Sequence, residues 1–469
     1  MNQAMPPQRH LGGFGGRHAV VIGASTTGLA AAAAAARHFE QVTVLERDAL
    51  PAEPVWRMGV PQGRHVHSLL KGGQKVFNHY FPGLTADMLR GGSVEVDLGR
   101  DIIWHHSGGW KRRFASGVRM QCQTKGYLEW SVRQRLLQWP CVAFRAGTGV
   151  RSLLVDDGRI TGVGLADGSM LEADLVVDAS GRSSSMPRFL QALDLPAPAV
   201  TELPVDIGYA SQIFRPGPSS RDWLGMLIHS SPPATRTAAL MPLEDGRWIV
   251  TLVGWNGDLP AADGNMASFM EWARGLPVPD LYRAIREAEP VDRVWRWKFV
   301  SNQRRHYERM RALPEGLVVS GDANTSLNPI YAQGMSQGAI GAGLLDASLD
   351  EQRRVAGPGR LRGLSQRFHQ RYARFIDQCW MTSTAEDYGV LGSHAQKAWY
   401  APLLARYLHR YTELTWHDES AARAFLDVMN LQKPPTSLLA PALLSKALFG
   451  RRREPRTEAP TLEAAVTAP

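Results

Sequence analysis

A glycine-rich turn near the N-terminus carries the clearest chemical signal in the sequence. Gly23 and Gly28 enclose residues 24–27 directly after the apolar run 19–22. In such a turn, backbone N–H groups and the N-terminus of the next helix can approach a pyrophosphate, because no Cβ atom stands in the way. Ser25 occupies the middle position of the G-x-G-x-x-G pattern, so an ordinary glycine-rich turn is the alternative. The residues that follow favour the first interpretation.

An acidic residue stands at the end of the next expected strand. Residues 42–45 form an apolar β-like run, and Glu46 follows it directly. A side chain there can accept hydrogen bonds from both hydroxyls of a ribose. Between the two strands, residues 29–36 are mostly alanine, which favours a helix that lies close to a sheet. Strand, turn, helix, strand and acid in this order predict a dinucleotide site.

A second polar turn occurs late in the chain. Gly321 and Asp322 follow the expected strand 316–320, and an Asp in that place can bind a polyol such as a ribityl chain. Pro329 and Gly334 then precede a Gly/Ala-rich helix, whose N-terminus carries partial positive charge. That charge would stabilise the edge of a reduced flavin. NAD needs no second site of this kind, so the sequence favours FAD.

The other elements must support these two turns. Residues 150–177 predict a β-meander, residues 204–255 predict an antiparallel sheet, and the pattern beyond residue 359 is helical. We therefore expect an α/β fold in which a Rossmann-like FAD-binding domain with a parallel sheet is interleaved with an antiparallel-sheet substrate domain and followed by a C-terminal helical region. The expected boundaries are 15–83, 145–195 and 310–355 for the FAD domain, 84–144 and 196–309 for the substrate domain, 356–450 for the helical region and 451–469 for a disordered tail.

Composition narrows the class of protein. The chain has 469 residues, of which 44% are hydrophobic and 21% charged, as in globular proteins. A net charge of +9 suits anionic ligands, but helix-turn-helix, zinc-finger and RNP signatures are missing, so we expect no nucleic acid. Three widely spaced cysteines predict no disulfide framework and no metal site. Residues 1–16 lack the apolar region of a secretory signal, so we expect a cytoplasmic protein.

Four segments resemble a known family: residues 59–67, 176–184 and 241–250, and the turn at 321–322. With them the chain resembles the class A flavoprotein monooxygenases, and within these it looks most like bacterial FAD-dependent epoxidases of polyether biosynthesis, the lasalocid and monensin type. The resemblance covers residues 18–307 and 316–345. Together with the turn chemistry it implies that FAD is bound by Gly23, Ser25, Thr27, Gly28, Glu46, Arg47, Gln62, Arg64, Asp178, Asp322, Gly334 and Met335.

The chain also departs from the pattern of that family. Residues 178–181 read Asp-Ala-Ser-Gly, which is shifted relative to the segment that touches FAD and NAD(P)H in related enzymes. We therefore expect electrons to come either from NAD(P)H directly or through a flavin reductase. Ala332 stands where the epoxidase-like pattern tends to have glycine. Trp295 and Trp297 resemble the W-x-W of flavin halogenases, but the Ile-Pro that follows there is missing, and we interpret them as packed aromatics of a strand.

The resemblance implies a monooxygenase of natural-product metabolism that inserts one oxygen atom of O₂ through a flavin C4a-hydroperoxide. We expect epoxidation of an alkene in a polyketide or terpenoid-like substrate. Aromatic hydroxylation and FAD-dependent reduction of a prenyl chain are the alternatives. The flavin would do the chemistry, so no catalytic residue is assigned. Five histidines are equal candidates for a base: His65, His67, His105, His106 and His229.

The expected partners are O₂ and a hydrophobic small molecule. The candidate pocket wall consists of Trp104, Phe214, Met226, Met241, Trp255 and Pro329. In the C-terminal region, residues 431–448 place leucines beside a basic cluster at 451–453. This pattern predicts either docking on the body of the protein or weak association with a membrane surface.

Overall fold

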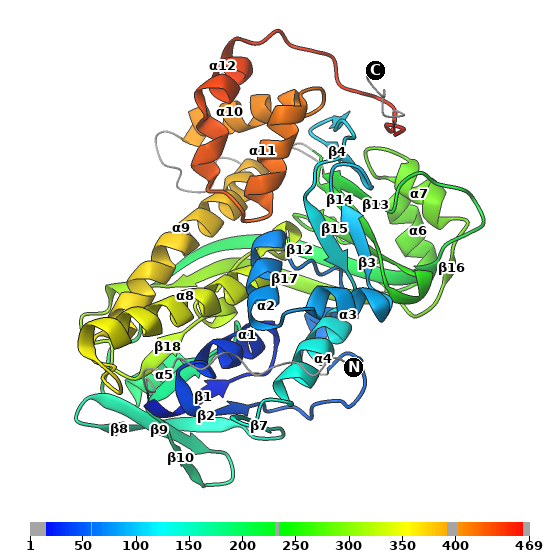
Figure 1. Ribbon diagram of the computed structural model, residues 1–469. Coiled ribbons are helices and arrows are strands. Elements are labelled where there is room, and N and C mark those ends of the chain that lie inside the picture. Colours follow the sequence, from blue (N-terminus) through cyan, green and yellow to red (C-terminus); the bar gives the residue numbers. More distant parts are fainter. Residues whose placement is uncertain (1–15, 58, 230–233, 392–400, 463–469) are drawn as a thin grey trace.

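A parallel sheet forms the centre of one half of the molecule (Figure 1). The computed structural model describes residues 16–57, 59–229, 234–391 and 401–462. Every neighbouring pair in this sheet is parallel, as predicted for a dinucleotide-binding fold. Its strands, in spatial order, are β18 (Leu317–Val319), β11 (Leu175–Asp178), β1 (Gly16–Ile22), β2 (Phe39–Leu45) and β7 (Val142–Arg145).

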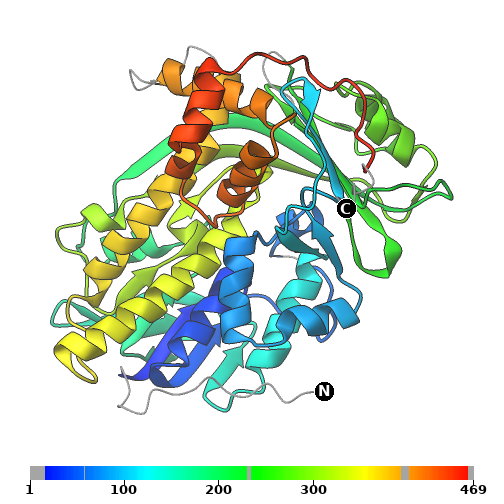
Figure 2. The same ribbon diagram turned by 45° about the horizontal axis from the view of Figure 1, so that its top comes forward.

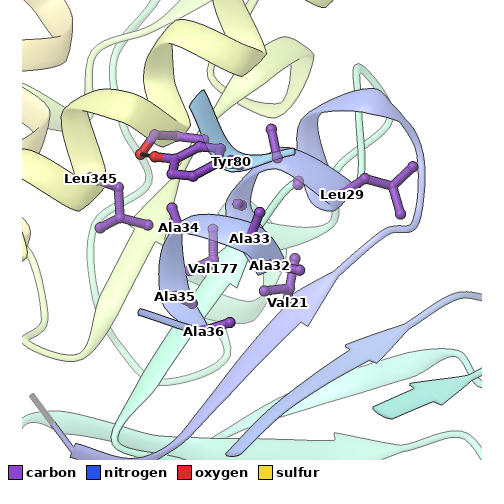
Figure 3. Packing of buried hydrophobic residues seen from close by; sticks show 14 of the residues in the cluster. Val21, Leu29, Ala32, Ala33, Ala34, Ala35, Ala36, Tyr80, Val177 and Leu345 are labelled. Carbon is purple, nitrogen blue, oxygen red and sulfur yellow. Dashed lines mark hydrogen bonds between the residues drawn. The ribbon is translucent and has the colours of Figure 1, made fainter. Parts of the chain in front are cut away.

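Helices cover this sheet, and the alanine-rich α1 lies closest to it. Its alanines are at most 1% exposed, and they pack with Val21 and Val177 of the sheet and with Tyr80 and Leu345 of neighbouring helices (Figure 3). The helices around the sheet are α1 (Thr26–Ala35), α2 (Lys71–Tyr80), α3 (Leu84–Arg90), α4 (Lys125–Leu136), α8 (Gln333–Ala356) and α9 (Leu364–Leu391). A short α5 (Met186–Gln191) and the predicted meander β8 (Val150–Asp156), β9 (Arg159–Leu165) and β10 (Met170–Glu172) complete this half.

One expected boundary differs from the structure. Helices α3 and α4 and strand β7 pack with the parallel sheet, although the sequence places residues 84–144 with the substrate domain. The reason is the apolar stripe of α4, in which Leu128, Val132 and Leu136 recur at helical spacing and enter the same hydrophobic core as α1.

The second half is built on a large, mainly antiparallel sheet. Strand β12 is the longest, has a register shift between Pro204 and Ile207, and pairs with strands on both sides. The strands of this sheet are β4 (Ile102–His106), β5 (Gly109–Trp110), β12 (Val200–Arg215), β13 (Gly225–His229), β14 (Arg236–Pro242), β15 (Trp248–Trp255), β16 (Glu289–Pro290), β17 (Trp295–Arg305) and β19 (Thr325–Ser326). A separate pair, β3 (Val94–Asp97) and β6 (Arg119–Cys122), lies outside it. The predicted fold class is therefore confirmed.

The two faces of this large sheet have different neighbours because side chains alternate along each strand. One face packs in a hydrophobic core with α6 (Met266–Arg274) and α7 (Asp280–Ile285). The other face carries Leu227, Ala239, Thr251 and Val253, which line a cavity. This alternation decides which residues of the sheet are available to a ligand.

The C-terminal region is helical, as predicted, and lies beside α8 and α9 (Figure 2). It contains α10 (Ala401–Leu414), α11 (Glu419–Met429) and α12 (Pro441–Phe449). Leu438 and Leu443 are buried against Tyr407 and Tyr411, so the leucine-rich segment packs on the other helices of the C-terminal region. None of the described helices has the length and apolar character needed to cross a membrane.

Residues 451–462 differ from the disordered tail that the sequence predicts. Residues 451–462 follow the surface of the antiparallel half instead of leaving it. Trp110 N donates to Arg456 O at 3.0 Å, and Leu462 N donates to Asp222 Oδ2 at 2.9 Å. The edge strand β5 offers unpaired backbone groups, which composition alone does not reveal. The rest of the expected tail, residues 463–469, lies outside the described residues.

Candidate cofactor and substrate site

A cavity of about 910 Å³ separates the two halves of the protein. One side is formed by residues that follow the carboxyl ends of β1, β2, β11 and β18, where open α/β sheets bind ligands. The other side is the free face of the large sheet. The cavity therefore brings together the two polar turns singled out in the sequence and an apolar wall.

The glycine-rich turn after β1 has the close packing that its residue types predict. Gly23 has a φ of 102°, and a Cβ atom on it would lie 2.6 Å from the carbonyl oxygen of Ala179. A Cβ atom on Gly28 would lie 1.8 Å from the carbonyl oxygen of Gly23. Gly23, Ser25 and Thr27 line the cavity, whereas Gly28 lies behind them and supports the turn. Larger residues at either glycine would displace the backbone of the turn.

Glu46 lies at the end of β2 and belongs to a network of buried charges. Its Oε2 accepts hydrogen bonds from Ala24 N at 2.8 Å and forms an ion pair with Arg57 Nη1 at 2.8 Å. Arg57 also donates to Glu129 Oε2 at 3.2 Å, and Ser25 Oγ donates to Glu129 Oε1 at 2.5 Å. Ser25, the departure from the glycine pattern, thus binds the turn to α4.

Sequence reasoning missed Arg57, Glu129 and Lys125, which line or border the cavity. Glu129 is buried, which by itself raises the pKa of its carboxyl, but Lys125, Arg57 and the Ser25 hydroxyl outweigh burial and lower it. Burial alone would lower the pKa of the Arg57 guanidinium, but the carboxylates of Glu129 and Glu46 outweigh burial and raise it. The sequence signal for this network was the polar residue Ser25 in the glycine-rich turn, because its hydroxyl needs a hydrogen-bond partner such as Glu129.

The second polar turn brings Asp322 and the N-terminus of α8 to the cavity. Burial raises the pKa of the Asp322 carboxyl, while Lys125 and Arg182 oppose that rise. No described residue donates a hydrogen bond to this carboxylate. Gly334 and Met335, in the first turn of α8, line the cavity beside it. A carboxylate without a donor among the described residues can accept hydrogen bonds from hydroxyl groups, and a helix N-terminus can stabilise an electron-rich edge.

Asp178 lines the cavity but is occupied by its own loop. Its Oδ1 accepts from Ser180 N at 3.0 Å and from Ser180 Oγ at 2.6 Å, and its Oδ2 accepts from Ser184 Oγ at 2.5 Å. Arg182 donates to the backbone oxygen of Ser301 at 2.6 Å and so connects this loop to β17. The shifted Asp-Ala-Ser-Gly segment therefore joins the two halves of the protein.

Gln62 and Arg47 line the cavity, but Arg64 does not. The Arg64 guanidinium lies over the ring of Trp295 at 3.5 Å and over that of Trp56 at 5.2 Å. This position outside the cavity differs from the expected contact with cofactor, because stacking on the two indoles holds the side chain away. Trp297, the other aromatic of the W-x-W pattern, does line the cavity.

Of the expected pocket wall, Trp104, Met241 and Pro329 line the cavity and three residues do not. Phe214 and Met226 lie on the opposite face of the sheet, in the core with α6 and α7. Trp255 packs with Ile207 and Phe299 in a separate hydrophobic cluster. Strand alternation explains the first two cases: Leu227, next to Met226, points to the cavity instead. The strand register, which the sequence did not reveal, determines which side chains form the wall of the cavity.

Three of the five candidate histidines line the cavity: His65, His67 and His229. Burial lowers the pKa of His65 to about 3 and that of His67 to about 4, so both side chains are neutral near pH 7. His106 packs behind His229, with ring centroids 5.1 Å apart, and burial holds its pKa well below the ordinary value. His105 packs against Trp110 at 5.3 Å, away from the cavity.

A curated protein with a similar sequence places the chain in a family. Protein Rv3254 of Mycobacterium tuberculosis is 32% identical over 355 residues, which cover 71% of this chain and 73% of that protein. The chain belongs to the family of Protein Rv3254. No protein-family model matches the chain.

Several solved structures similar to this member of the Rv3254 family are flavoproteins. PqsL of Pseudomonas aeruginosa, a probable FAD-dependent monooxygenase, is 18% identical with a TM-score of 0.58 over 79% of this chain and 97% of its own. The flavin-dependent brominase Bmp2 is 14% identical with a TM-score of 0.62 over 88% and 93%. An oxygenase of 2-methyl-3-hydroxypyridine-5-carboxylic acid is 19% identical with a TM-score of 0.58 over 84% and 96%. The Rv3254-family chain therefore has the fold of FAD-dependent monooxygenases and halogenases.

Proposed function

We propose that the protein is an FAD-dependent monooxygenase that acts on a hydrophobic small molecule. The observation that carries the proposal is one continuous cavity that joins two helix N-termini and two acidic side chains, Glu46 and Asp322, to the apolar face of an antiparallel sheet. The first part suits a dinucleotide with a polyol chain, and the second suits an apolar substrate.

The residues of the cavity fit FAD. Gly23 and the N-terminus of α1 would receive the pyrophosphate, since a Cβ at this glycine would collide with the Ala179 backbone. Glu46 would accept hydrogen bonds from the ribose hydroxyls, and Asp322, which has no donor among the described residues, would accept hydrogen bonds from the hydroxyls of the ribityl chain. Gly334 and Met335 would face the ring edge. When bound, FAD supplies the activation of O₂ and the transfer of one oxygen atom to the substrate.

The chain itself excludes water and orients the substrate. Trp104, Leu227, Met241 and Val253 offer apolar surface, and Met429 of α11 closes the cavity from the C-terminal region. His65 is held by Ser211 Oγ at 2.7 Å, and its low pKa makes it a weak base. The apolar wall and a neutral His65 suit a substrate that needs no deprotonation. We therefore propose an alkene of a polyketide or terpenoid-like molecule, and thus epoxidation within natural-product metabolism.

The test has two steps. First, the purified protein is denatured and its released flavin is identified by chromatography; FAD is expected, and a chain that neither carries nor takes up FAD contradicts the proposal. Second, the loaded protein is incubated under ¹⁸O₂ with NADPH, a flavin reductase and a panel of polyenes and phenols. One ¹⁸O atom in an epoxide supports epoxidation, and one in a catechol supports the aromatic hydroxylase. A product saturated without oxygen uptake supports the prenyl reductase.

The electron source is tested separately. NADH or NADPH is mixed with the oxidised FAD protein without oxygen, and bleaching of the flavin absorbance is followed with and without a flavin reductase. Because residues 178–184 bind one another and Ser301, we expect slow direct reduction and fast reduction through the reductase. Fast bleaching by NADPH alone contradicts this expectation.

The surface of α12 supports the membrane association proposed from the sequence. Leu448 is 51% and Phe449 is 83% exposed, and Arg451, Arg452 and Arg453 follow them on the surface. Apolar side chains beside cations suit an anionic lipid surface. The protein is expected to sediment with vesicles that contain phosphatidylserine, because an anionic leaflet attracts basic segments. Phe449→Ser and replacement of the three arginines by Gln should release it, and equal sedimentation with pure phosphatidylcholine contradicts the idea.

A further inference from the structure

Helix α9 holds the loop that leads into α8, which we call the 327–333 loop. Asp387 of α9 accepts hydrogen bonds at Oδ1 from Asn328 Nδ2 at 2.9 Å and from the Tyr331 hydroxyl at 3.0 Å. At the other end of the loop, Gln333 Nε2 donates to Thr382 Oγ1 at 2.9 Å, and Ser383 Oγ donates to Gln333 Oε1 at 3.2 Å. One helix thus anchors both ends of the loop.

The network around Asp387 is buried and extends to the large sheet. Asn302 of β17 donates through Nδ2 to Asp387 Oδ2 at 2.6 Å, and its Oδ1 accepts from Asn328 N at 2.7 Å. Tyr209 of β12 donates its hydroxyl to Asn328 Oδ1 at 3.0 Å. Asn302, Asn328 and Asp387 are at most 1% exposed, so water does not compete for these bonds. Burial together with the Asp387 carboxylate raises the pKa of Tyr209 well above its ordinary value, which keeps this hydroxyl a donor.

Between the two anchors the backbone adopts an unfavourable conformation. Ala332 has a φ of 53° and a ψ of 23°, which is the left-handed region that L residues rarely occupy. It is the residue directly before the first turn of α8, and its conformation turns the chain so that Gly334 and Met335 line the cavity. A strained residue persists where its surroundings hold it, and here α9 contacts the loop on both sides of Ala332.

We propose that Asp387 is a positioning residue that, through Asn328 and Tyr331, fixes the 327–333 loop and the N-terminus of α8 in the conformation that receives the ring of the cofactor. The inference rests on the proposed FAD function for its ligand, but not for its geometry. It assigns the C-terminal region a part in cofactor binding, although the sequence suggests only a helical cover for it.

The substitution Asp387→Asn separates position from packing, because the side chains have nearly the same shape. Its amide nitrogen would face the Nδ2 group of Asn302, which is also a donor. Turning Asn302 to relieve this contact would cost its bond to Asn328 N. One buried polar group is therefore left without a partner, and the loop loses an anchor.

The experiment measures two quantities on the full chain. Hydrogen exchange of the peptide covering residues 327–335 is followed by mass spectrometry on protein without flavin, and the dissociation constant of FAD is measured by fluorescence. The matched control is Asp346→Asn, since Asp346 is also buried in α8 and bonded to His38 at 2.6 Å, but lies away from the loop. The rescue variant combines Ala332→Gly with Asp387→Asn, because glycine adopts the left-handed conformation without support.

Asp387→Asn is expected to speed exchange in the loop and to weaken FAD binding, each by roughly tenfold, with Asp346→Asn changing both by less than about threefold. The rescue variant should recover most of the FAD affinity. Unchanged exchange in the loop, an equal effect of Asp346→Asn, or no recovery with Ala332→Gly would overturn the proposal. If the wild-type chain binds no FAD, the proposed function fails, and loop exchange alone then decides whether Asp387 positions the loop.

Discussion

At the residue scale, the cavity combines strained backbone with paired buried charge. Ala332 occupies the left-handed region, and Arg57 lies between Glu46 and Glu129 beneath the glycine-rich turn. Both features store unfavourable free energy locally, one as backbone strain and the other as desolvation of charge. Substitutions at these positions report on that cost directly.

Replacing Ala332 by glycine is expected to stabilise the protein. Glycine accepts a φ of 53° without the clash of a Cβ atom, and the gain exceeds the entropy cost of glycine, leaving about 1 kcal/mol. Thermal unfolding of Ala332→Gly should therefore occur at higher temperature than in the wild type. Ala347→Gly, at an exposed helical position of α8, is the control and should cost about 1 kcal/mol. Equal destabilisation by both substitutions would contradict the strained conformation.

Glu129→Gln is expected to destabilise the protein by about 3 kcal/mol, because it leaves the buried Arg57 guanidinium with one carboxylate fewer. Denaturant unfolding measures this loss. The comparison is Glu271→Gln on the surface of α6, whose pair with Arg274 is largely exposed and should contribute close to nothing. Similar small effects at the two sites would show that the Arg57 network contributes little to stability.

At the element scale, two helix contacts differ in what holds them: the crossing of α1 and α8, and the docking of α12 on α11. Small residues let α1 and α8 approach each other: a Cβ atom on Gly338 would lie 2.0 Å from Thr27 Oγ1. In the C-terminal region, Asp418 caps α11 and also accepts a hydrogen bond from Lys446 of α12 at 2.7 Å. Steric fit therefore controls the contact between α1 and α8, and charge contributes to the contact between α11 and α12.

Gly338→Ala and Gly343→Ala should have opposite effects although both lie in α8. A methyl group at position 338 collides with Thr27 and is expected to cost at least about 2 kcal/mol. At position 343 the nearest atom, Val76 Cγ2, is 3.7 Å away, so the better helix propensity of alanine should add roughly 0.5–1 kcal/mol. Thermal unfolding of both variants checks this. Stabilisation by Gly338→Ala would show that the two helices lie further apart.

The contact between α11 and α12 should weaken in acid. Burial alone would raise the pKa of Asp418, but hydrogen bonds from Lys446, Ser420 and Ala421 N outweigh it and lower the pKa to about 2. Because this folded value lies below the unfolded value of about 3.9, the stabilisation is complete above pH ~4 and is lost as the pH falls toward 2. The pair is partly exposed, so the loss is expected to stay below about 1 kcal/mol.

Unfolding free energies measured between pH 2 and 6 test this prediction. The difference between the wild type and Asp418→Asn should be largest above pH ~4, should fall steeply toward pH 2 and should vanish only below it. A difference that does not change with pH would mean that Asp418 acts only as the cap of α11.

At the scale of the whole molecule, distant segments hold the two halves around the cavity. Met429 and Asn430, at the end of α11, line the cavity, while Gly72 N donates to Asn430 O at 2.9 Å. Beyond α12, residues 451–462 run to the large sheet, where Arg113 donates to Pro460 O at 3.2 Å. The C-terminal region therefore bridges both halves and covers the cavity at the same time.

Removal of the last segment should destabilise the protein. A chain ending at Gly450 loses the bonds to Trp110, Arg113 and Asp222 and is expected to unfold with about 1–3 kcal/mol less free energy. A chain ending at Leu462 retains these bonds and is the reference. Denaturant unfolding of the two chains measures the difference. Identical midpoints would mean that the segment makes no net contribution.

The sequence by itself determined the elements whose chemistry is local. The turn at Gly23 to Gly28, the acid at Glu46 and the Gly321-Asp322 turn each depend on a few neighbouring residues, and all were predicted with the fold class. Conformational demands on glycine and the position of an acid at a strand end act over a single turn or strand, so they are visible without the tertiary structure.

Only the tertiary structure decided which side chains meet. Strand register sent Phe214 and Met226 to a core and Leu227 to the cavity, because a side chain changes face with each residue. Asp387 and Glu129 lie 59 and 104 residues from their partners Asn328 and Ser25, and nothing local in the sequence pairs them. Residues so far apart in the sequence meet only when the chain folds, because the packing of helices and strands closes the long loops between them.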